Sequence, residues 1–453
     1  MLTRRSLAGV AGVLFATGAS DAAGAQAQHQ PPPAGPQAPG GSRAEEAASL
    51  RRFAETTHPR GREAVADTAW LAHWSALERN AGDLSDGAYA LALRRGLAWF
   101  ADGHTTVLPP EFAGVPDPLK GGVFGKQLPA RARPFADGLY ITSATVEFEA
   151  LKGRKITAIG GEDVNHLLRR WAETWCGSPA WARNWAGTMF TPAALEGMGI
   201  NASGGVEVRT DAGAVTLPLL AEAERTAITT PPMPPEAWRS GGAVNFVRDL
   251  PDRGALYLGM DAHSEGDDAM RTFSQQALAA MDSTSAARVV LDLRRNGGGD
   301  NFWGEPLRKA LERSRFNRPG GLYVLISPAT FSAAQNLATR LERETYALFG
   351  GEPTGGAPNH YGDAQFWTGG VTGLMAMVST IPWFDSYPMD RRNWIMPDQI
   401  IPATFADFVA GRDPALEWAL THTTAAQADD LAQDRVFFFG RASQRAAWAP
   451  FWS

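Results

Sequence analysis

The stretch Leu291-Asp-Leu-Arg-Arg-Asn-Gly-Gly-Gly299 and the later stretch Ser327-Pro-Ala-Thr-Phe-Ser-Ala-Ala-Gln335 decide the fold of this chain. An apolar run, Val289 to Leu293, leads into the first, and another, Leu322 to Ile326, leads into the second. Short apolar runs that end in turn residues predict buried strands. The residues that begin at Ser332 predict a helix. Each strand therefore ends in a loop, and the second loop leads into a helix.

The two loops favour acyl-transfer chemistry when they are taken together. A helix begins with unpaired N–H groups and a partial positive charge, so the Ala333 N–H can donate to a developing oxyanion. Gly298, in the glycine loop, can supply a second N–H because no side chain prevents close approach. Taken alone, Ser332 is more typical of a helix N-cap, and the glycines are more typical of a plain turn. The combination predicts Ser332 as a nucleophile.

Strands and helices alternate from about Asn245 onward. This alternation predicts an α/β fold with a mainly parallel sheet that is covered on both faces. The expected strands are 255–260, 288–293, 322–326 and 346–349, with one or two antiparallel strands in 371–381. The expected helices are 267–281, 305–313 and 332–343.

The composition of the 453-residue chain is ordinary for a globular protein of two or three domains, with 44% hydrophobic and 20% charged residues. A net charge of −6 does not favour nucleic acid or an anionic membrane as a partner. Arg4-Arg5, a short apolar run and the small residues 19–27 predict a twin-arginine-like signal peptide over 1–27. The run is too short to span a bilayer, so we expect export to the periplasm or beyond, with no membrane span in the mature form.

The rest of the chain divides by composition. We expect a Pro/Gly linker (28–43), a helical domain (44–108), a middle domain (109–244), a catalytic core (245–425) and an aromatic tail (426–453). In the middle domain Asp163 is expected to cap a helix over 164–175. The spacing of its tryptophans favours a packed core over a substrate groove. The lone Cys176 cannot form an internal disulfide and is expected to be a small buried side chain.

The paired motifs resemble the S41 family of serine peptidases, which includes C-terminal processing peptidases, tricorn-like peptidases and interphotoreceptor retinoid-binding-protein-like domains. The resemblance covers roughly Ala44 to Leu420. It implies a ClpP/crotonase-like catalytic core behind the helical domain, and a middle domain that is a degenerate PDZ-like module or a family-specific insert. Besides the two central stretches, it is carried by Asp102-Gly-His-Thr105, Gly351-Glu-Pro-Thr-Gly-Gly356, Pro397-Asp-Gln-Ile-Ile401 and Gly411-Arg-Asp-Pro-Ala-Leu416.

The general base is where the chain departs from the processing peptidases. They have a lysine just after the Gly-Glu-x-Thr-x-Gly motif, where this chain has Ala357, and no lysine follows Lys309. The tricorn-like branch has a histidine in the helical domain instead, so the resemblance implies His104 as the base. His360, close to the lost lysine position, is the alternative. Asp390 is the nearest acid to the position of the tricorn-like glutamate. It is expected either to orient His104 or to pair with an arginine.

The sequence thus predicts an exported serine peptidase that acts on peptides or proteins, with no cofactor and no metal. His263 to Asp268 contain residue types that metals favour, but the acids there fit the start of a helix better. Two alternatives stay open: an inactive ligand-binding protein on the same fold, and an esterase or amidase for small molecules. The oligomeric state and the cleavage specificity do not follow from the sequence.

Overall fold

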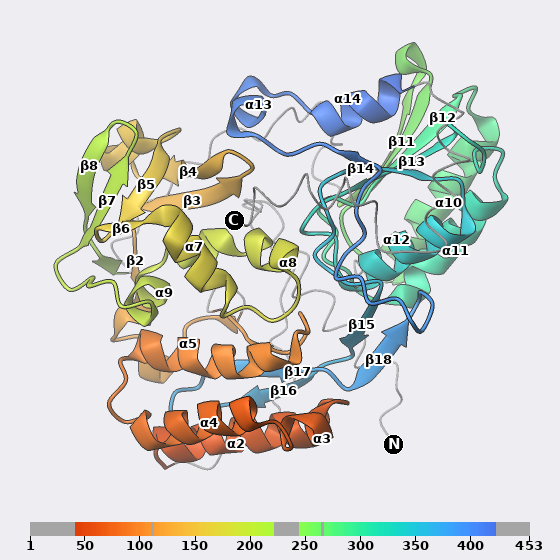
Figure 1. The fold of residues 1–453 in the computed structure, drawn as a ribbon. Coiled ribbons are helices and arrows are strands. Elements are labelled where there is room, and N and C mark those ends of the chain that lie inside the picture. Colours follow the sequence, from red (N-terminus) through yellow and green to blue (C-terminus); the bar gives the residue numbers. More distant parts are fainter. Residues whose placement is uncertain (1–40, 110–112, 222–243, 264–266, 423–453) are drawn as a thin grey trace. The chain divides into compact units, whose positions relative to one another are not determined.

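The computed structural model describes residues 41–109, 113–221, 244–263 and 267–422 (Figure 1). The chain forms two compact units. The serine unit, named for Ser332, holds the described residues of 244–360 and 383–422. The histidine unit, named for His104, holds those of 41–221 and 361–382. The predicted signal peptide and the aromatic tail lie outside the described residues.

The serine unit is built on a six-stranded sheet. Its strand order is β10-β11-β12-β13-β14-β19, with β10 antiparallel to β11 and all other neighbours parallel. The strands are β10 (Asn245–Leu250), β11 (Ala255–Met260), β12 (Arg288–Asp292), β13 (Leu322–Ile326), β14 (Leu348–Gly351) and β19 (Gln399–Ile400). Every residue of β11 and β13 is buried, as in a sheet with both faces covered.

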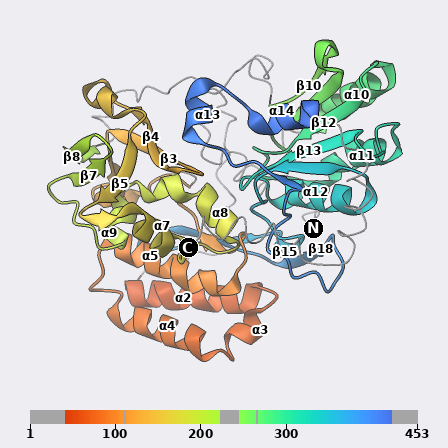
Figure 2. The ribbon, with the colours of Figure 1, turned by 45° about the horizontal axis from the view of Figure 1, so that its top comes forward.

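Helices cover both faces of this sheet (Figures 1 and 2). Helices α10 (Asp267–Ser283), α11 (Asn301–Arg313) and α12 (Ser332–Glu344) share one apolar core with alternate strand residues. Helix α14 (Pro414–Thr421) packs on the opposite face, against the intervening strand residues. Helix α13 (Phe405–Ala410) precedes α14. The predicted α/β fold is therefore confirmed.

Two predicted element starts in this unit differ from the structure, and several predicted ends differ by one or two residues. Helix α11 begins four residues before its predicted start, because the Asp300 side chain accepts the Phe302 N–H and caps it. Strand β14 begins at Leu348 rather than Tyr346, since its register pairs Leu348 with Tyr323. The Tyr346 N–H is instead bonded to Asn317. Strands β11 and β13 have their predicted bounds.

The helical part of the histidine unit consists of α2 (Arg43–Thr57), α3 (Gly61–Ala64), α4 (Thr68–Asn80) and α5 (Asp86–Leu97). A three-stranded antiparallel sheet packs with them, in the order β1 (Thr106–Val107), β17 (Met375–Val378), β16 (Gln365–Thr368). This pairing with β1 explains why residues 361–382 belong to the histidine unit, although the sequence grouped them with the core at 245–425.

The middle part of the same unit is an antiparallel sheet in the order β3-β4-β5-β7-β8, with β6 on β5. Its strands are β3 (Ala130–Phe135), β4 (Gly138–Ala144), β5 (Lys155–Ile159), β6 (Glu162–Asp163), β7 (Val206–Thr210) and β8 (Gly213–Leu217). Strand β2 (Lys126–Gln127) pairs with β9 (Leu220–Ala221). Its helices are α7 (Val164–Ala172), α8 (Pro179–Asn184) and α9 (Pro192–Gly197).

The tryptophans of this middle part are core residues. Trp171, Trp175, Trp181 and Trp185 are all buried, as their helical spacing favoured. Asp163 caps α7 as predicted, although the helix ends three residues before its expected end at Trp175. Cys176 is also buried, in agreement with its expected structural role.

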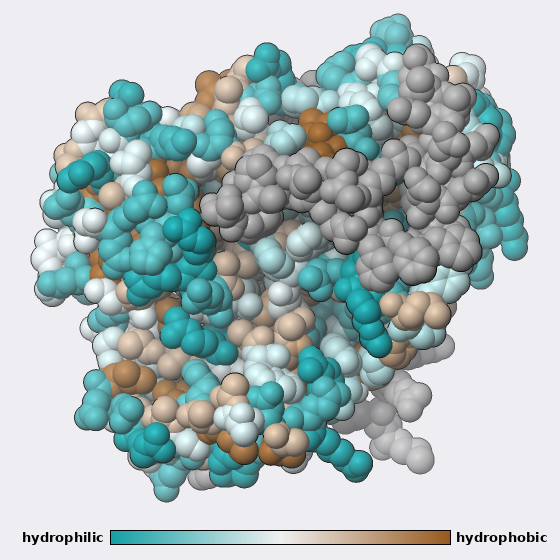
Figure 3. All heavy atoms as spheres, in the orientation of Figure 1, coloured by the Kyte–Doolittle hydropathy of each residue, from teal (hydrophilic) through white to brown (hydrophobic). Residues whose placement is uncertain are grey.

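Strands β15 (Asn359–Gly362) and β18 (Ile381–Phe384) pair with each other. The chain leaves the serine unit within β15 and returns to it within β18. Among the described residues no helix is long and apolar enough to cross a membrane. In the histidine unit, hydrophilic and apolar residues are intermingled on the viewed surface over the helical part (Figure 3).

Candidate active site

Backbone and hydroxyl hydrogen bonds join the two loops that the sequence singled out. The Phe331 N–H donates to the Asn296 carbonyl (3.1 Å), and the Thr330 hydroxyl donates to the Leu293 carbonyl (2.9 Å). The Ser327 hydroxyl donates to the Arg294 carbonyl (2.5 Å). These loops follow β12 and β13, which are neighbouring parallel strands, so their carboxyl ends meet at one edge of the sheet.

Gly298 lies directly against Ser332. A Cβ atom at Gly298 would stand 2.5 Å from the Ser332 Cβ and 2.8 Å from the Ala333 nitrogen. The φ angle of Gly298 is also +109°, a conformation that L side chains rarely adopt. Only glycine therefore fits this position, and the structure brings Gly298, Ser332 and Ala333 together.

Ser332 has a strained backbone. Its φ angle is +52°, in the left-handed region that non-glycine residues seldom occupy. It is the first residue of α12, and its side chain is half-buried, whereas Ala333 behind it is buried. Such strain persists only where surrounding structure imposes it, and it is often found at functional sites.

The Gly298 N–H has a partner in the protein. It donates to the Asn296 Oδ1 (2.9 Å), and the Asn296 Nδ2 donates to the Met260 carbonyl (2.9 Å). The His263 Nδ1 lies 3.2 Å from the same Asn296 Oδ1, and His263 is completely buried. Neither Asn296 nor His263 was predicted from the sequence to be a site residue. Both follow parallel strands of one sheet, which is the signal that could have placed them here.

An ion-pair network joins the start of the glycine loop to Asp413. The Arg294 guanidinium bonds both carboxylate oxygens of Asp292 and both of Asp413, at distances of 2.6 to 3.0 Å. Asp413 also caps α14 through the Leu416 N–H. Burial would raise the pKa of Asp413, but Arg294 outweighs that effect and lowers it. Two motifs far apart in the sequence thus form one structural contact.

The segment that lacks the family lysine lies beside the start of α12. The Gly355 N–H donates to the Thr330 carbonyl (3.0 Å), and a Cβ at Gly356 would stand 2.9 Å from the Gln335 Cγ. Ala357 follows directly, and its carbonyl is 3.0 Å from the His360 Nδ1. Because a carbonyl only accepts, the His360 Nδ1 carries the proton. His360 is therefore part of the serine unit, near the lost lysine position in the chain.

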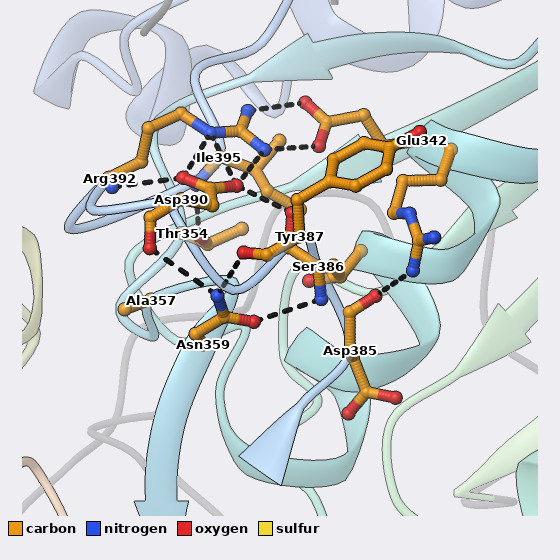
Figure 4. A network of polar contacts seen from close by, with 12 residues as sticks. Glu342, Thr354, Ala357, Asn359, Asp385, Ser386, Tyr387, Asp390, Arg392 and Ile395 are labelled. Carbon is orange, nitrogen blue, oxygen red and sulfur yellow. Dashed lines mark hydrogen bonds and ion pairs between the residues drawn. The ribbon is translucent and has the colours of Figure 1, made fainter. Parts of the chain in front are cut away.

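Asp390 is paired with an arginine, one of the two roles that the sequence left open (Figure 4). Arg392 bonds both oxygens of Asp390 and both of Glu342 on α12. The Ser386 hydroxyl also donates to Asp390 (2.6 Å). Burial would raise the pKa of Asp390, but Arg392 and Ser386 lower it. This network ties the 386–392 segment to the helix that begins at Ser332.

In the histidine unit, Asp102 and His104 form a buried turn. The Asp102 carboxylate accepts the His104 N–H (3.1 Å), the Thr105 hydroxyl (2.7 Å) and the Ser379 hydroxyl (2.6 Å). The His104 Nδ1 lies 3.8 Å from the same carboxylate, and both side chains are almost completely buried. The turn packs on Gly177, where an added Cβ would stand 3.2 Å from Gly103. A histidine is therefore held next to a buried carboxylate.

A second histidine, His58, which was not predicted from the sequence, also lies next to Asp102. The His58 Nε2 lies 3.5 Å from the Asp102 Oδ2, and the Arg60 N–H donates to the His58 Nδ1 (3.0 Å). Since Nδ1 accepts, the proton of neutral His58 is on Nε2 and faces Asp102. Burial would raise the pKa of Asp102, but His104 and His58 hold it well below its ordinary value. No sequence pattern connects His58 to this turn.

Among the comparisons with known proteins, only the comparison with solved structures finds matches, and these concern the fold. No family model matches the chain, and no curated protein matches it. The structure of mature CPAF complexed with lactacystin matches with a TM-score of 0.57 at 11% identity, covering 87% of this chain and 99% of that one. Another structure of mature CPAF matches with a TM-score of 0.56 at 12% identity, over 88% of this chain and 99% of that one.

A third match, the photosystem II D1 C-terminal processing protease, has a TM-score of 0.37 at 16% identity and covers 80% of this chain and 93% of that one. The CPAF matches show that almost the whole CPAF fold is present in this chain. The predicted resemblance to S41-type serine peptidases is therefore confirmed at the level of the fold. Among the described residues, no group of three or more potential metal ligands gathers.

Proposed function

We propose that the protein is a serine peptidase with Ser332 as its nucleophile. The observation that carries this proposal is the contact of Gly298 with Ser332 and Ala333, which leaves no room for a Cβ. It holds a hydroxyl and backbone N–H groups together in the way that acyl transfer requires. The strained φ angle of Ser332 and the CPAF-like fold support the same conclusion.

The oxyanion would be stabilised by the N–H groups of Ala333 and Gly298. The Ala333 N–H lies at the start of α12, where the helix also contributes a partial positive charge. The Gly298 N–H donates to Asn296 in this structure, so it has to turn from Asn296 to the oxyanion during the reaction. Two donors to a developing oxyanion are a large source of rate acceleration.

His104 is our proposed general base, with Asp102 rather than Asp390 as the carboxylate beside it. The Asp-Gly-His-Thr motif supports His104, and the buried carboxylate in its own turn supports the pairing with Asp102. A buried, ionised carboxylate stabilises the imidazolium that forms when the base takes the Ser332 proton. Asp390 is held by Arg392 and would instead fix the segment beside α12. His360 is the alternative base.

The substrate class follows from the proposed chemistry and from the resemblance: peptides or unfolded proteins. The mature protein would act after export, as the twin-arginine-like N-terminus predicts. Fractionation of cells that express the full chain, beside a variant with Arg4 and Arg5 changed to Lys, tests the export. Retention of the unchanged chain in the cytoplasm would contradict it.

The experiment that tests the peptidase proposal is hydrolysis of an unstructured protein such as casein, followed by mass spectrometry of the fragments. We expect cleavage by the purified chain and none by Ser332→Ala. Cleavage of small esters alone would favour the esterase alternative. Cleavage that persists in Ser332→Ala would remove Ser332 as the nucleophile.

A further inference from the structure

A buried pair, His263 and Asn296, lies directly behind the glycine loop. His263 follows β11 and Asn296 follows β12, so both stand at the same edge of the sheet as Ser332. Both side chains are completely buried. A buried polar pair at this position calls for a physical account because each of its groups needs a partner.

The hydrogen bonds fix the orientation of both side chains. The Asn296 Nδ2 donates to the Met260 carbonyl, so the atom that faces the loop is Oδ1, an acceptor. The Gly298 N–H donates to this Oδ1 (2.9 Å). The His263 Nδ1, 3.2 Å from the same Oδ1, must then be protonated. His263 therefore carries a proton on Nδ1, and the Asn296 Oδ1 accepts from two donors.

The backbone of His263 also forms hydrogen bonds with the loop. Its N–H donates to the Gly298 carbonyl (2.9 Å), and its carbonyl accepts the Asp300 N–H (3.3 Å). A Cβ at Gly299 would stand 2.7 Å from the His263 carbonyl carbon. Burial lowers the pKa of His263 to about 4, against a smaller opposing effect of Asn296, which favours a neutral ring. The carbonyl side of Gly298 is thus fixed while its N–H faces a shared acceptor.

We propose that His263 is a positioning residue that allows the Gly298 N–H to leave Asn296 for the oxyanion. When Gly298 turns, Asn296 Oδ1 keeps the His263 donor and is not left buried without a partner. An unsatisfied buried acceptor is costly, so without His263 the turn of Gly298 would be opposed at the moment the oxyanion forms. This inference rests on the proposed peptidase function and deepens it.

The test compares three variants of the full chain. His263→Leu removes the donor. His263→Gln moves the donor one bond further out. His263→Asn keeps an N–H donor at the position of Nδ1. We expect kcat to fall ten- to a hundredfold in the Leu and Gln variants with KM nearly unchanged, because the lost contact acts on the oxyanion. The Asn variant should recover most of the loss.

A matched control separates this effect from general destabilisation. Phe273 is buried on α10, in the apolar core of the same unit, and Phe273→Leu changes only that core. It should lower the melting temperature without changing kcat. Equal kcat values for the Leu, Gln and Asn variants would overturn the inference, as would a loss in all of them that matches the loss of stability.

A measurement on the unmodified protein covers the case in which the Leu and Gln variants fail to fold. With glycine and histidine labelled with ¹⁵N, a peptide boronate that bonds to Ser332 should shift the Gly298 amide resonance strongly. The His263 Nδ1–H resonance should persist in both states. An unchanged Gly298 resonance in the boronate adduct would overturn the inference but leave the peptidase proposal intact. If neither a boronate nor a fluorophosphonate reacts with Ser332, the peptidase proposal fails and this inference fails with it.

Discussion

The two units hold their candidate site residues by different kinds of contact. In the serine unit the decisive contacts involve backbone: Gly298 against Ser332, and the loop bonds that start at Thr330 and Phe331. In the histidine unit they involve side chains: one buried carboxylate, Asp102, with two histidines and two hydroxyls around it. The first arrangement depends on the absence of a Cβ atom, and the second depends on a charge. Different substitutions should therefore damage each of them.

The largest effect is expected in the side-chain arrangement. His104→Ala should lower kcat by three to four orders of magnitude, roughly the contribution of a general base. His360→Ala should change kcat less than tenfold. Steady-state kinetics on one peptide substrate would measure both. A severe loss in His360→Ala with a mild one in His104→Ala would reverse our assignment of the base.

Adding a single methyl group at Gly298, in the backbone arrangement, should lower kcat. Gly298→Ala places a Cβ 2.5 Å from that of Ser332, so we expect kcat to fall by two to three orders of magnitude, as for the loss of an oxyanion donor. Gly254→Ala is the matched control, since Gly254 also has a positive φ (+58°) but would meet no atom within 4 Å. Gly254→Ala should lose about 1 kcal/mol of unfolding free energy from the backbone strain alone, and Gly298→Ala should lose more because its Cβ also clashes. Similar kinetics in the two variants would show that the clash is not what matters.

Acid should weaken the serine unit through His263. Its pKa in the folded protein is about 4, below the ordinary value of 6.5. Between these values the unfolded chain binds a proton that the folded chain does not. The free energy of unfolding therefore falls as the pH falls from about 6.5 to about 4, by about 3 kcal/mol in total.

His263→Asn lacks this titration and provides the reference. The stability difference between the unchanged chain and this variant should shift by that amount between pH 7 and pH 4 in urea unfolding. A difference that does not depend on pH would mean that His263 is not held neutral by burial.

A smaller effect is expected where side chains support the backbone arrangement. Asp413→Asn keeps the cap of α14 but loses the charged bonds to Arg294, which should lower the unfolding free energy by about 2 kcal/mol. Arg253 and Glu417 form an exposed ion pair in the same unit, so Glu417→Gln is the control and should cost less than 1 kcal/mol. Equal losses in urea unfolding would show that the Arg294 network adds no stability of its own.

The sequence predicted the parts of the molecule that follow from local pattern. Strands β11 and β13 are continuous apolar runs because both sheet faces are covered, so their bounds could be predicted. The meeting of Gly298 and Ser332 followed from the rule that parallel strands end at one edge. What depended on distant pairing could not be predicted. Examples are His58 beside Asp102, the bonds from Arg294 to Asp413, and the transfer of residues 361–382 to the histidine unit.

Asp390 shows the same limit at the scale of one residue. The sequence placed it near several arginines and near an expected catalytic position, and nothing in its spacing chose between them. In the structure Asp390 is paired with Arg392, and the same guanidinium also bonds Glu342 on α12. Asp102 is two residues from His104 in the chain, yet its burial and its second histidine emerge only from the packed unit.

The most direct test of the central claim is labelling of the purified protein with a fluorophosphonate, followed by peptide mapping of the adduct, with Ser332→Ala beside it. An activated serine in the backbone arrangement described above predicts a single adduct on Ser332 that is absent from the variant. A folded protein that takes no label, or one that is labelled equally in both forms, would contradict the account.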